Sequence, residues 1–142
     1  LDTARAKKAE EEGHLVLQAD ATADETLIEA GIERAGGVVC ALADDAANTF
    51  ITLSARGLNE HINIVCRAAN PGSEGKMLRA GAKKVISTLW AIPDEITAEF
   101  CRSFYSYYFT TGDVHKALME AKNKLRRQGL SPEKWAAFRI LN

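Results

Sequence analysis

The stretch GAKKVISTLWAIPDE (Gly81–Glu95) separates two patterns of secondary structure in this chain. Before it, short apolar runs alternate with amphipathic segments, and after it two helical patterns follow in succession. The apolar runs GGVVCAL (Gly36–Leu42), INIVCRA (Ile62–Ala68) and KKVISTLW (Lys83–Trp90) are typical of strands that are covered on both faces. Their alternation with helices predicts a parallel α/β sheet.

The segment before these runs predicts one more strand and one more helix. HLVLQ (His14–Gln18) has the length of a short strand, and Thr22 with Glu25 three residues later has the pattern of a capping box. A right-handed crossover through Thr22–Gly31 allows this strand to lie directly beside Gly36–Leu42. We therefore expect these two strands to be neighbours in the sheet.

Two helices are predicted after the sheet strands. Asp113 is expected to cap the second of them, as Asp44 or Asp45 is expected to cap an earlier helix. The first carries apolar residues at every fourth position, which form one stripe: Ile96, Phe100, Phe104 and Tyr108. We expect the two helices, at 94–109 and 113–127, to cover the face of the sheet that the crossover helices leave open.

The predicted fold is a single α/β domain over residues 1–142. It has three layers, with a mostly parallel sheet of about five strands, Rossmann-like or flavodoxin-like, and helices on both faces. Residues 134–141 (KWAAFRIL) predict the last strand, which lies at a sheet edge and can be antiparallel. On this strand we expect Trp135 and Phe138 to complete the core.

Composition excludes several classes of protein. The net charge is −1 and the pI is about 6.4, so the sequence favours neither a nucleic-acid partner nor an anionic membrane. No apolar run reaches the roughly 20 residues of a membrane span. Three scattered cysteines, Cys40, Cys66 and Cys101, indicate a reduced, cytoplasmic setting. The histidines lack metal-binding spacing, so no metal site is predicted.

Residues 1–87 resemble a known family on several sequence words. The order and spacing of these short motifs resemble those of the RCK or TrkA-N family, the Rossmann-like regulatory domain of potassium channels and transporters. The motifs are LDT, GHLVLQADAT, INIVCRA and GAKKVIS. By this resemblance, Asp2 stands at the acidic position that holds a nucleotide ribose. Asp20, Ala21 and Thr22 match the family's GDAT turn beside the adenine and ribose, with Ala19 in place of the usual glycine.

The same family pattern opens with a GxGxxG turn that holds the pyrophosphate at a helix N-terminus. No GxGxxG occurs in the 142 residues. At the carboxyl end of a predicted strand, where open α/β sheets bind ligands, Arg67 is the one charged residue that could meet a phosphate, although a solvated or salt-bridged arginine is the more frequent case.

Residues 85–141 resemble the closing part of a CHAT domain, a caspase-like family. The words are STLWAIPDEITAEFCRSFYSYY, GDVHKALMEAKNKL and WAAFRIL. Proteases of that family use a cysteine and a histidine from earlier strands. Cys101 and His115 lie in the closing segment and fit neither catalytic motif, so the resemblance implies no catalytic residue here.

Two functional interpretations follow. The first is a non-enzymatic scaffold, an engineered chimera of the two families without a cofactor or a natural activity. It is suggested by the position of the change from one resemblance to the other, which falls inside one strand, whereas natural domain linkers normally lie in exposed loops. The alternative is a ligand-sensing regulatory domain of a potassium channel or transporter, which binds an adenine nucleotide weakly and acts as a homodimer.

Overall fold

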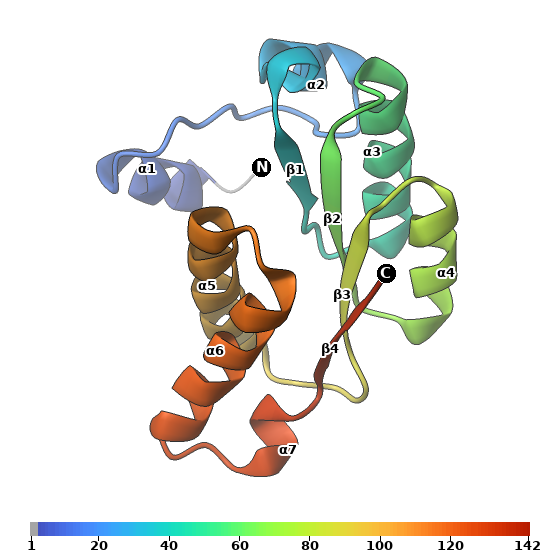
Figure 1. The fold of residues 1–142 in the computed structure, drawn as a ribbon. Helices are drawn as coiled ribbons and strands as arrows, with labels where there is room; N and C mark the ends of the chain where they lie inside the picture. The colour runs from blue at the N-terminus through green and yellow to red at the C-terminus, as the bar shows by residue number, and fades with distance from the viewer. Residues whose placement is uncertain (1–2) are drawn as a thin grey trace.

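The central sheet has four strands in the order β1-β2-β3-β4 (Figure 1). In this computed structural model, which describes residues 3–142, β1 (Gly37–Cys40), β2 (Asn63–Ala68) and β3 (Lys84–Thr88) are parallel. β4 (Phe138–Leu141) pairs antiparallel with β3. The predicted mostly parallel α/β sheet with an antiparallel edge strand is confirmed, with four strands rather than five.

The first helices cover one face of the sheet. They are α2 (Asp24–Glu29), a 3-10 helix η1 (Ile32–Arg34), α3 (Asp45–Leu58) and α4 (Pro71–Arg79). Their buried side chains form one cluster with the strand residues that face them, including Ile64 and Val85, which are fully buried. Asp44 caps α3 as predicted, because its carboxylate accepts from the backbone N–H groups of Ala46 and Ala47.

The opposite face is covered by α5 (Asp94–Thr111) and α6 (Val114–Arg127), which stand together beside the sheet in Figure 1. Phe100 and Phe104 are fully buried between α5 and the strands, and Phe100 stacks on Phe138 with ring centroids 3.7 Å apart. The prediction that these two helices cover the second face is confirmed. The predicted cap of α6 is also confirmed, since Asp113 accepts from two backbone N–H groups.

The prediction of a strand at His14–Gln18 is wrong. This segment has no regular secondary structure, Leu15 is fully exposed, and β1 pairs only with β2 among the described strands. A strand is stable only where a neighbour takes up its backbone N–H and C=O groups, and no described segment does so for His14–Gln18. The expected pairing with Gly36–Leu42 is therefore absent from the structure.

Two smaller predictions are also corrected. Ala23, not Thr22, is the N-cap of α2, and no side chain caps this helix, so the capping box with Glu25 is not formed. The last strand begins at Phe138, because Pro132–Trp135 forms a helical turn, α7. Trp135 is consequently half-buried on α7 rather than on a strand.

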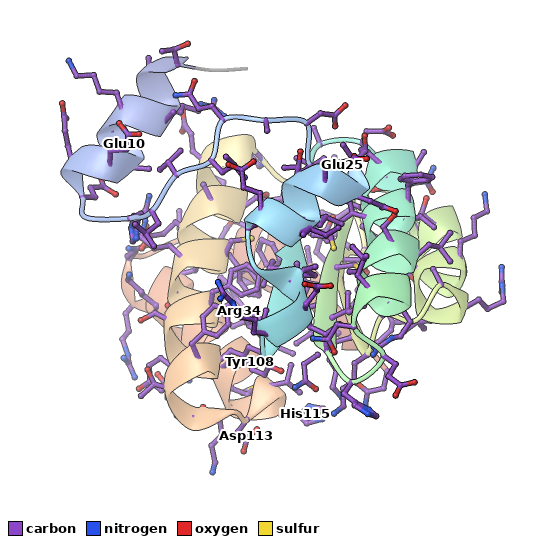
Figure 2. The ribbon with its side chains drawn as sticks, turned by 90° about the horizontal axis from the view of Figure 1, so that it is seen from above. Glu10, Glu25, Arg34, Tyr108, Asp113 and His115 are labelled. Atoms are coloured by element: carbon purple, nitrogen blue, oxygen red, sulfur yellow. The ribbon has the colours of Figure 1, made fainter. Side chains whose placement is uncertain are left out.

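The opening helix α1 (Thr3–Glu11) lies apart from the sheet and has no buried residue. Figure 2 shows it projecting beyond the start of α5, and its residue Glu10 is exposed. No helix among residues 3–142 is both long and apolar enough to cross a membrane.

Candidate functional site

The loops at the carboxyl ends of β1 and β2 are tied together by one buried side chain. The amide of Asn48 on α3 accepts from Leu42 N at 2.9 Å and donates to the carbonyl oxygens of Leu42 and Arg67 at 2.9 and 3.1 Å. Asn48 is fully buried, so each of these bonds replaces one to water. Sequence reasoning missed Asn48, because nothing in its helical position distinguishes it from a solvated residue.

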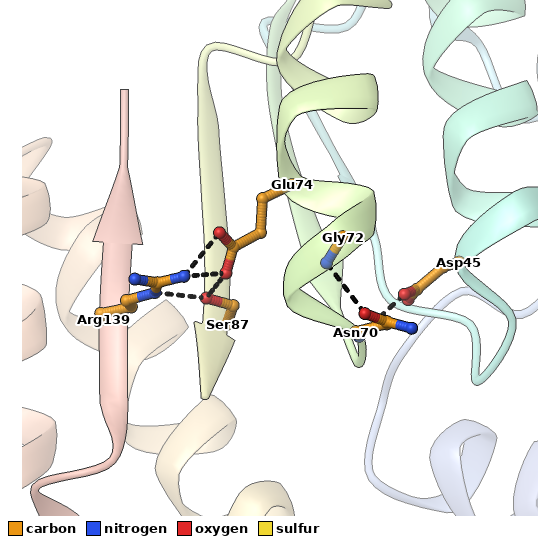
Figure 3. A network of polar contacts seen from close by, with 6 residues as sticks. All are labelled: Asp45, Asn70, Gly72, Glu74, Ser87 and Arg139. Carbon is orange, nitrogen blue, oxygen red and sulfur yellow. Dashed lines mark hydrogen bonds and ion pairs between the residues drawn. The ribbon is translucent and has the colours of Figure 1, made fainter. Parts of the chain in front are cut away.

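A second polar link joins the same loops. The carboxylate of Asp45 accepts from Ala69 N at 2.8 Å and Asn70 N at 2.9 Å, and Asn70 in turn caps α4 by accepting from Gly72 N (Figure 3). Asp44 and Asp45 therefore have different structural roles: Asp44 caps α3, and Asp45 holds the loop after β2. Both carboxylates have structural partners, and neither is a candidate acid or base.

A pocket opens beside these loops, between the carboxyl ends of the strands and α5. It measures about 600 Å³, and Arg67 of β2 and Cys101 and Tyr105 of α5 line it. A smaller adjoining pocket of about 180 Å³ shares Arg67 and Cys101 and reaches Ser87 and Thr88 at the end of β3. This is the position at which open α/β sheets bind ligands.

The turn at Asp20–Thr22 forms a separate, exposed feature. One carboxylate oxygen of Asp20 accepts from Thr22 N at 2.9 Å and from Thr22 Oγ1 at 2.7 Å. These hydrogen bonds hold the pKa of Asp20 below its usual value, so the carboxylate is ionised at neutral pH. Ala21 packs against the core cluster of α3. The turn is thus preformed, and none of its three residues lines the two pockets at Arg67.

The remaining residue singled out by resemblance, Asp2, lies outside the described residues. Among residues 3–142, no group of three or more histidine, cysteine or carboxylate side chains could hold a metal ion.

Cys101 and His115 do not form a catalytic pair. Cys101 faces the pocket at Arg67, and burial raises the pKa of its thiol, which disfavours the nucleophilic thiolate. His115 is exposed in the first turn of α6 and lies near Asp113, which caps this helix (Figure 2). The two side chains have no hydrogen bond or ion pair with each other.

One buried ionic network joins the two parts of the chain. Arg139 of β4 donates to both carboxylate oxygens of Glu74 on α4, at 2.7 and 2.6 Å, and to Ser87 Oγ of β3 at 3.2 Å (Figure 3). Ser87 Oγ also donates to Glu74. Glu74 and Ser87 are buried, and the two contacts from Nη2 of Arg139, together with the bond from Ser87, satisfy the carboxylate. The network is structural, because it holds the antiparallel edge strand on the parallel sheet.

The model of the TrkA-N domain family matches residues 1–88. The chain belongs to the TrkA-N domain family. This part of the chain carries the turn at Asp20–Thr22, Arg67 and the first three strands. The match ends at residue 88, so the resemblance of residues 85–141 to a CHAT domain stays a prediction.

Among curated relatives, potassium channel protein 1 of Methanocaldococcus jannaschii is 42% identical over 72 residues, which are 51% of this chain and 22% of that protein. The probable potassium channel protein 2 of the same organism is 40% identical over 73 residues, 51% of this chain and 21% of that protein. The TrkA-N chain thus spans only about a fifth of the length of these channel proteins.

Solved structures agree with this assignment. The crystal structure of the GsuK RCK domain has a TM-score of 0.50 and 43% identity, over 52% of this chain and 16% of that one. Structures of the GsuK channel bound to NAD and of GsuK bound to ADP match equally well, with TM-scores of 0.50 and 43% identity. The TrkA-N domain of Escherichia coli ybaL shares the fold, with a TM-score of 0.55 and 21% identity over 70% of both chains.

Proposed function

We propose that this chain is a non-enzymatic regulatory domain of a potassium channel or transporter, and that it binds an adenine nucleotide. The observation that carries the proposal is the 43% identity to GsuK, for which structures with NAD and with ADP are known. The curated relatives at 40–42% identity are potassium channel proteins. These findings support the regulatory interpretation better than an engineered scaffold without activity.

The preformed turn at Asp20–Thr22 is the proposed contact for the nucleoside. The ionised Asp20 can accept hydrogen bonds from ribose hydroxyls, and the turn already holds its backbone, so little ordering entropy is lost on binding. By the resemblance, Asp2 adds a second carboxylate at the ribose. Both groups recognise the sugar, and neither attracts the phosphates.

We expect the affinity of these 142 residues for NAD or ADP to be low. The sequence holds no GxGxxG turn to place backbone N–H groups around a pyrophosphate. The dissociation constant should therefore be no tighter than about 1 mM, which corresponds to roughly −4 kcal/mol. A micromolar constant would contradict this account of the site.

The test is a calorimetric titration of the purified chain with NAD, ADP, AMP and adenosine, together with thermal unfolding in each ligand. With a dissociation constant of about 1 mM, a ligand at about 10 mM adds roughly 1.4 kcal/mol to the free energy of unfolding. Asp20→Asn removes the charge of the turn and keeps its shape, and Glu29→Gln, at an exposed position of α2, is the matched control. Selective loss of binding in Asp20→Asn supports the proposal, and absence of binding by all four ligands refutes it.

The homodimer that the resemblance implies is part of the same proposal. The free edge of β1 borders a pocket of about 350 Å³ that Tyr108 and the exposed Phe109 line. Apolar groups beside an unpaired strand edge favour association with a second chain. Sedimentation at several concentrations measures this association, and a monomer at all of them would contradict it.

A further inference from the structure

Arg67 is a cation on a core face of the sheet without a carboxylate partner. Its neighbours in the strand, Cys66 and Ala68, pack on the α3 side, so its own side chain points to the α5 side, as Val65 does. Its side chain makes one hydrogen bond, a long one of 3.4 Å from Nη1 to the carbonyl oxygen of Leu42, and it forms no ion pair with a described side chain. Arg139, in contrast, has both oxygens of Glu74.

A half-buried guanidinium without a counter-ion is costly, because desolvation of the charge is not repaid by a nearby anion. The protein offers no described carboxylate within ion-pair distance, and Glu95 lines the wider pocket without reaching Arg67. Arg5 also lines this pocket.

Tyr105 supplies a second unmet donor in the same pocket. Its hydroxyl is fully buried and is the one buried side-chain polar atom in residues 3–142 that has no hydrogen-bond partner. Burial raises the pKa of Tyr105, so the hydroxyl keeps its proton and needs an acceptor. A buried hydroxyl without a hydrogen-bond partner is destabilising, and native proteins rarely retain one without a reason.

The rest of the lining is compatible with an anion. Because burial raises the pKa of Cys101, its thiol is neutral at physiological pH and brings no negative charge. The volume of about 600 Å³ lies in the range of small-molecule sites. A guanidinium presents several N–H groups in one plane, an arrangement that matches the oxygens of a phosphate.

We propose that the pocket between β2 and α5 binds the phosphate group of a small molecule, with the guanidinium of Arg67 and the hydroxyl of Tyr105 as its donors. The site goes beyond the proposed nucleoside contact at Asp20–Thr22 and needs none of its residues. It joins the TrkA-N part of the chain to α5, so an occupied site holds this helix against the sheet.

The experiment measures thermal unfolding of the full chain in increasing inorganic phosphate and, separately, glycerol phosphate, with sodium chloride at matched ionic strength as the reference. The two probes distinguish free phosphate from a phosphate ester. We expect a saturable rise in Tm with at least one of them and none with chloride. A rise with acetate as large as that with phosphate would overturn the assignment to phosphate.

Two variants remove one donor each. Arg67→Met and Tyr105→Phe should each raise the half-saturating phosphate concentration at least tenfold, whereas Arg126→Gln, on the exposed side of α6, should leave it unchanged. Without phosphate, both variants should melt at or above the temperature of the parent chain, because Arg67→Met removes a charge without a carboxylate partner and Tyr105→Phe removes an unpaired hydroxyl. A merely structural role predicts the opposite, a lower Tm.

The outcomes separate the two proposals. A phosphate response that depends on Arg67 and Tyr105, with no binding of adenosine or NAD, upholds this site and refutes the nucleoside contact. Unchanged phosphate response in Tyr105→Phe and Arg67→Met, or no response to phosphate in the parent chain, overturns the site. If Arg67→Met fails to fold, Tyr105→Phe alone decides, since it changes one buried oxygen atom.

Discussion

Phe104 provides the sharpest test of how the second half of the chain stabilises the first. Its ring is fully buried between α5 and the sheet, and its centroid lies 6.0 Å from that of Phe100, 5.2 Å from Tyr105 and 5.9 Å from Tyr108. Phe104→Ala removes the ring from the middle of this row. The neighbours on both sides are themselves held by α5, so the cavity cannot collapse fully.

Truncation of a buried phenylalanine to alanine costs about 3–5 kcal/mol. The whole domain is expected to have a stability of about 5–15 kcal/mol, so this loss is a large fraction. With an unfolding entropy of about 2.1 cal/mol/K per residue, the 142 residues give roughly 0.3 kcal/mol/K, and a loss of 4 kcal/mol lowers Tm by about 13 °C.

The assay is calorimetric or circular-dichroism melting of the parent chain and two variants. Phe109→Ala is the matched control, because Phe109 lies on the same helix and is 69% exposed. We expect it to change Tm by only a few degrees. If Phe104→Ala melted within about 3 °C of the parent, α5 would not be part of the cooperative core, and its packing on the sheet would be refuted.

Three further predictions rest on single contacts. Arg139→Met leaves the buried carboxylate of Glu74 without its cation and should lower the free energy of unfolding in urea by about 3–5 kcal/mol. The double variant Arg139→Met/Glu74→Leu should recover much of that loss, and equal stability of the single variant and the parent would disprove the pairing. The hydrogen bond from the backbone N–H of Lys116 lowers the pKa of Asp113 in the folded state, so the carboxylate stabilises the fold above the unfolded pKa of 3.8 and loses this effect as pH falls through the folded pKa. The difference in stability between the parent and Asp113→Ala should therefore shrink below about pH 3.8, and a difference that grows on acidification would contradict the cap. The purified chain should show no peptidase turnover, so Cys101→Ala should have no effect on activity. Stoichiometric labelling of Cys101 by a cysteine-reactive peptide probe, if it required His115, would contradict this and reopen the catalytic interpretation.

Local patterns predicted most of the elements correctly. Asp44 and Asp113 cap helices because a cap needs only a carboxylate and the N–H groups two and three residues ahead. The aromatic spacing of α5 likewise predicted its buried face, since residues four apart share one side of a helix. The turn at Asp20–Thr22 is local as well, although its use as a cap for α2 was predicted wrongly.

What the sequence by itself determined is therefore the set of local elements and their apolar faces, because contacts within about four residues encode them. Only the tertiary structure decided which backbone and side-chain polar groups find a partner. His14–Gln18 has the pattern of a strand but no described neighbour, and a strand depends on one. Glu74 and Arg139, 65 residues apart, meet across the sheet. Arg67, in contrast, meets no described carboxylate, and the hydroxyl of Tyr105 has no described hydrogen-bond partner. Burial in three dimensions sets the cost of an unpaired polar group, and no local pattern records it.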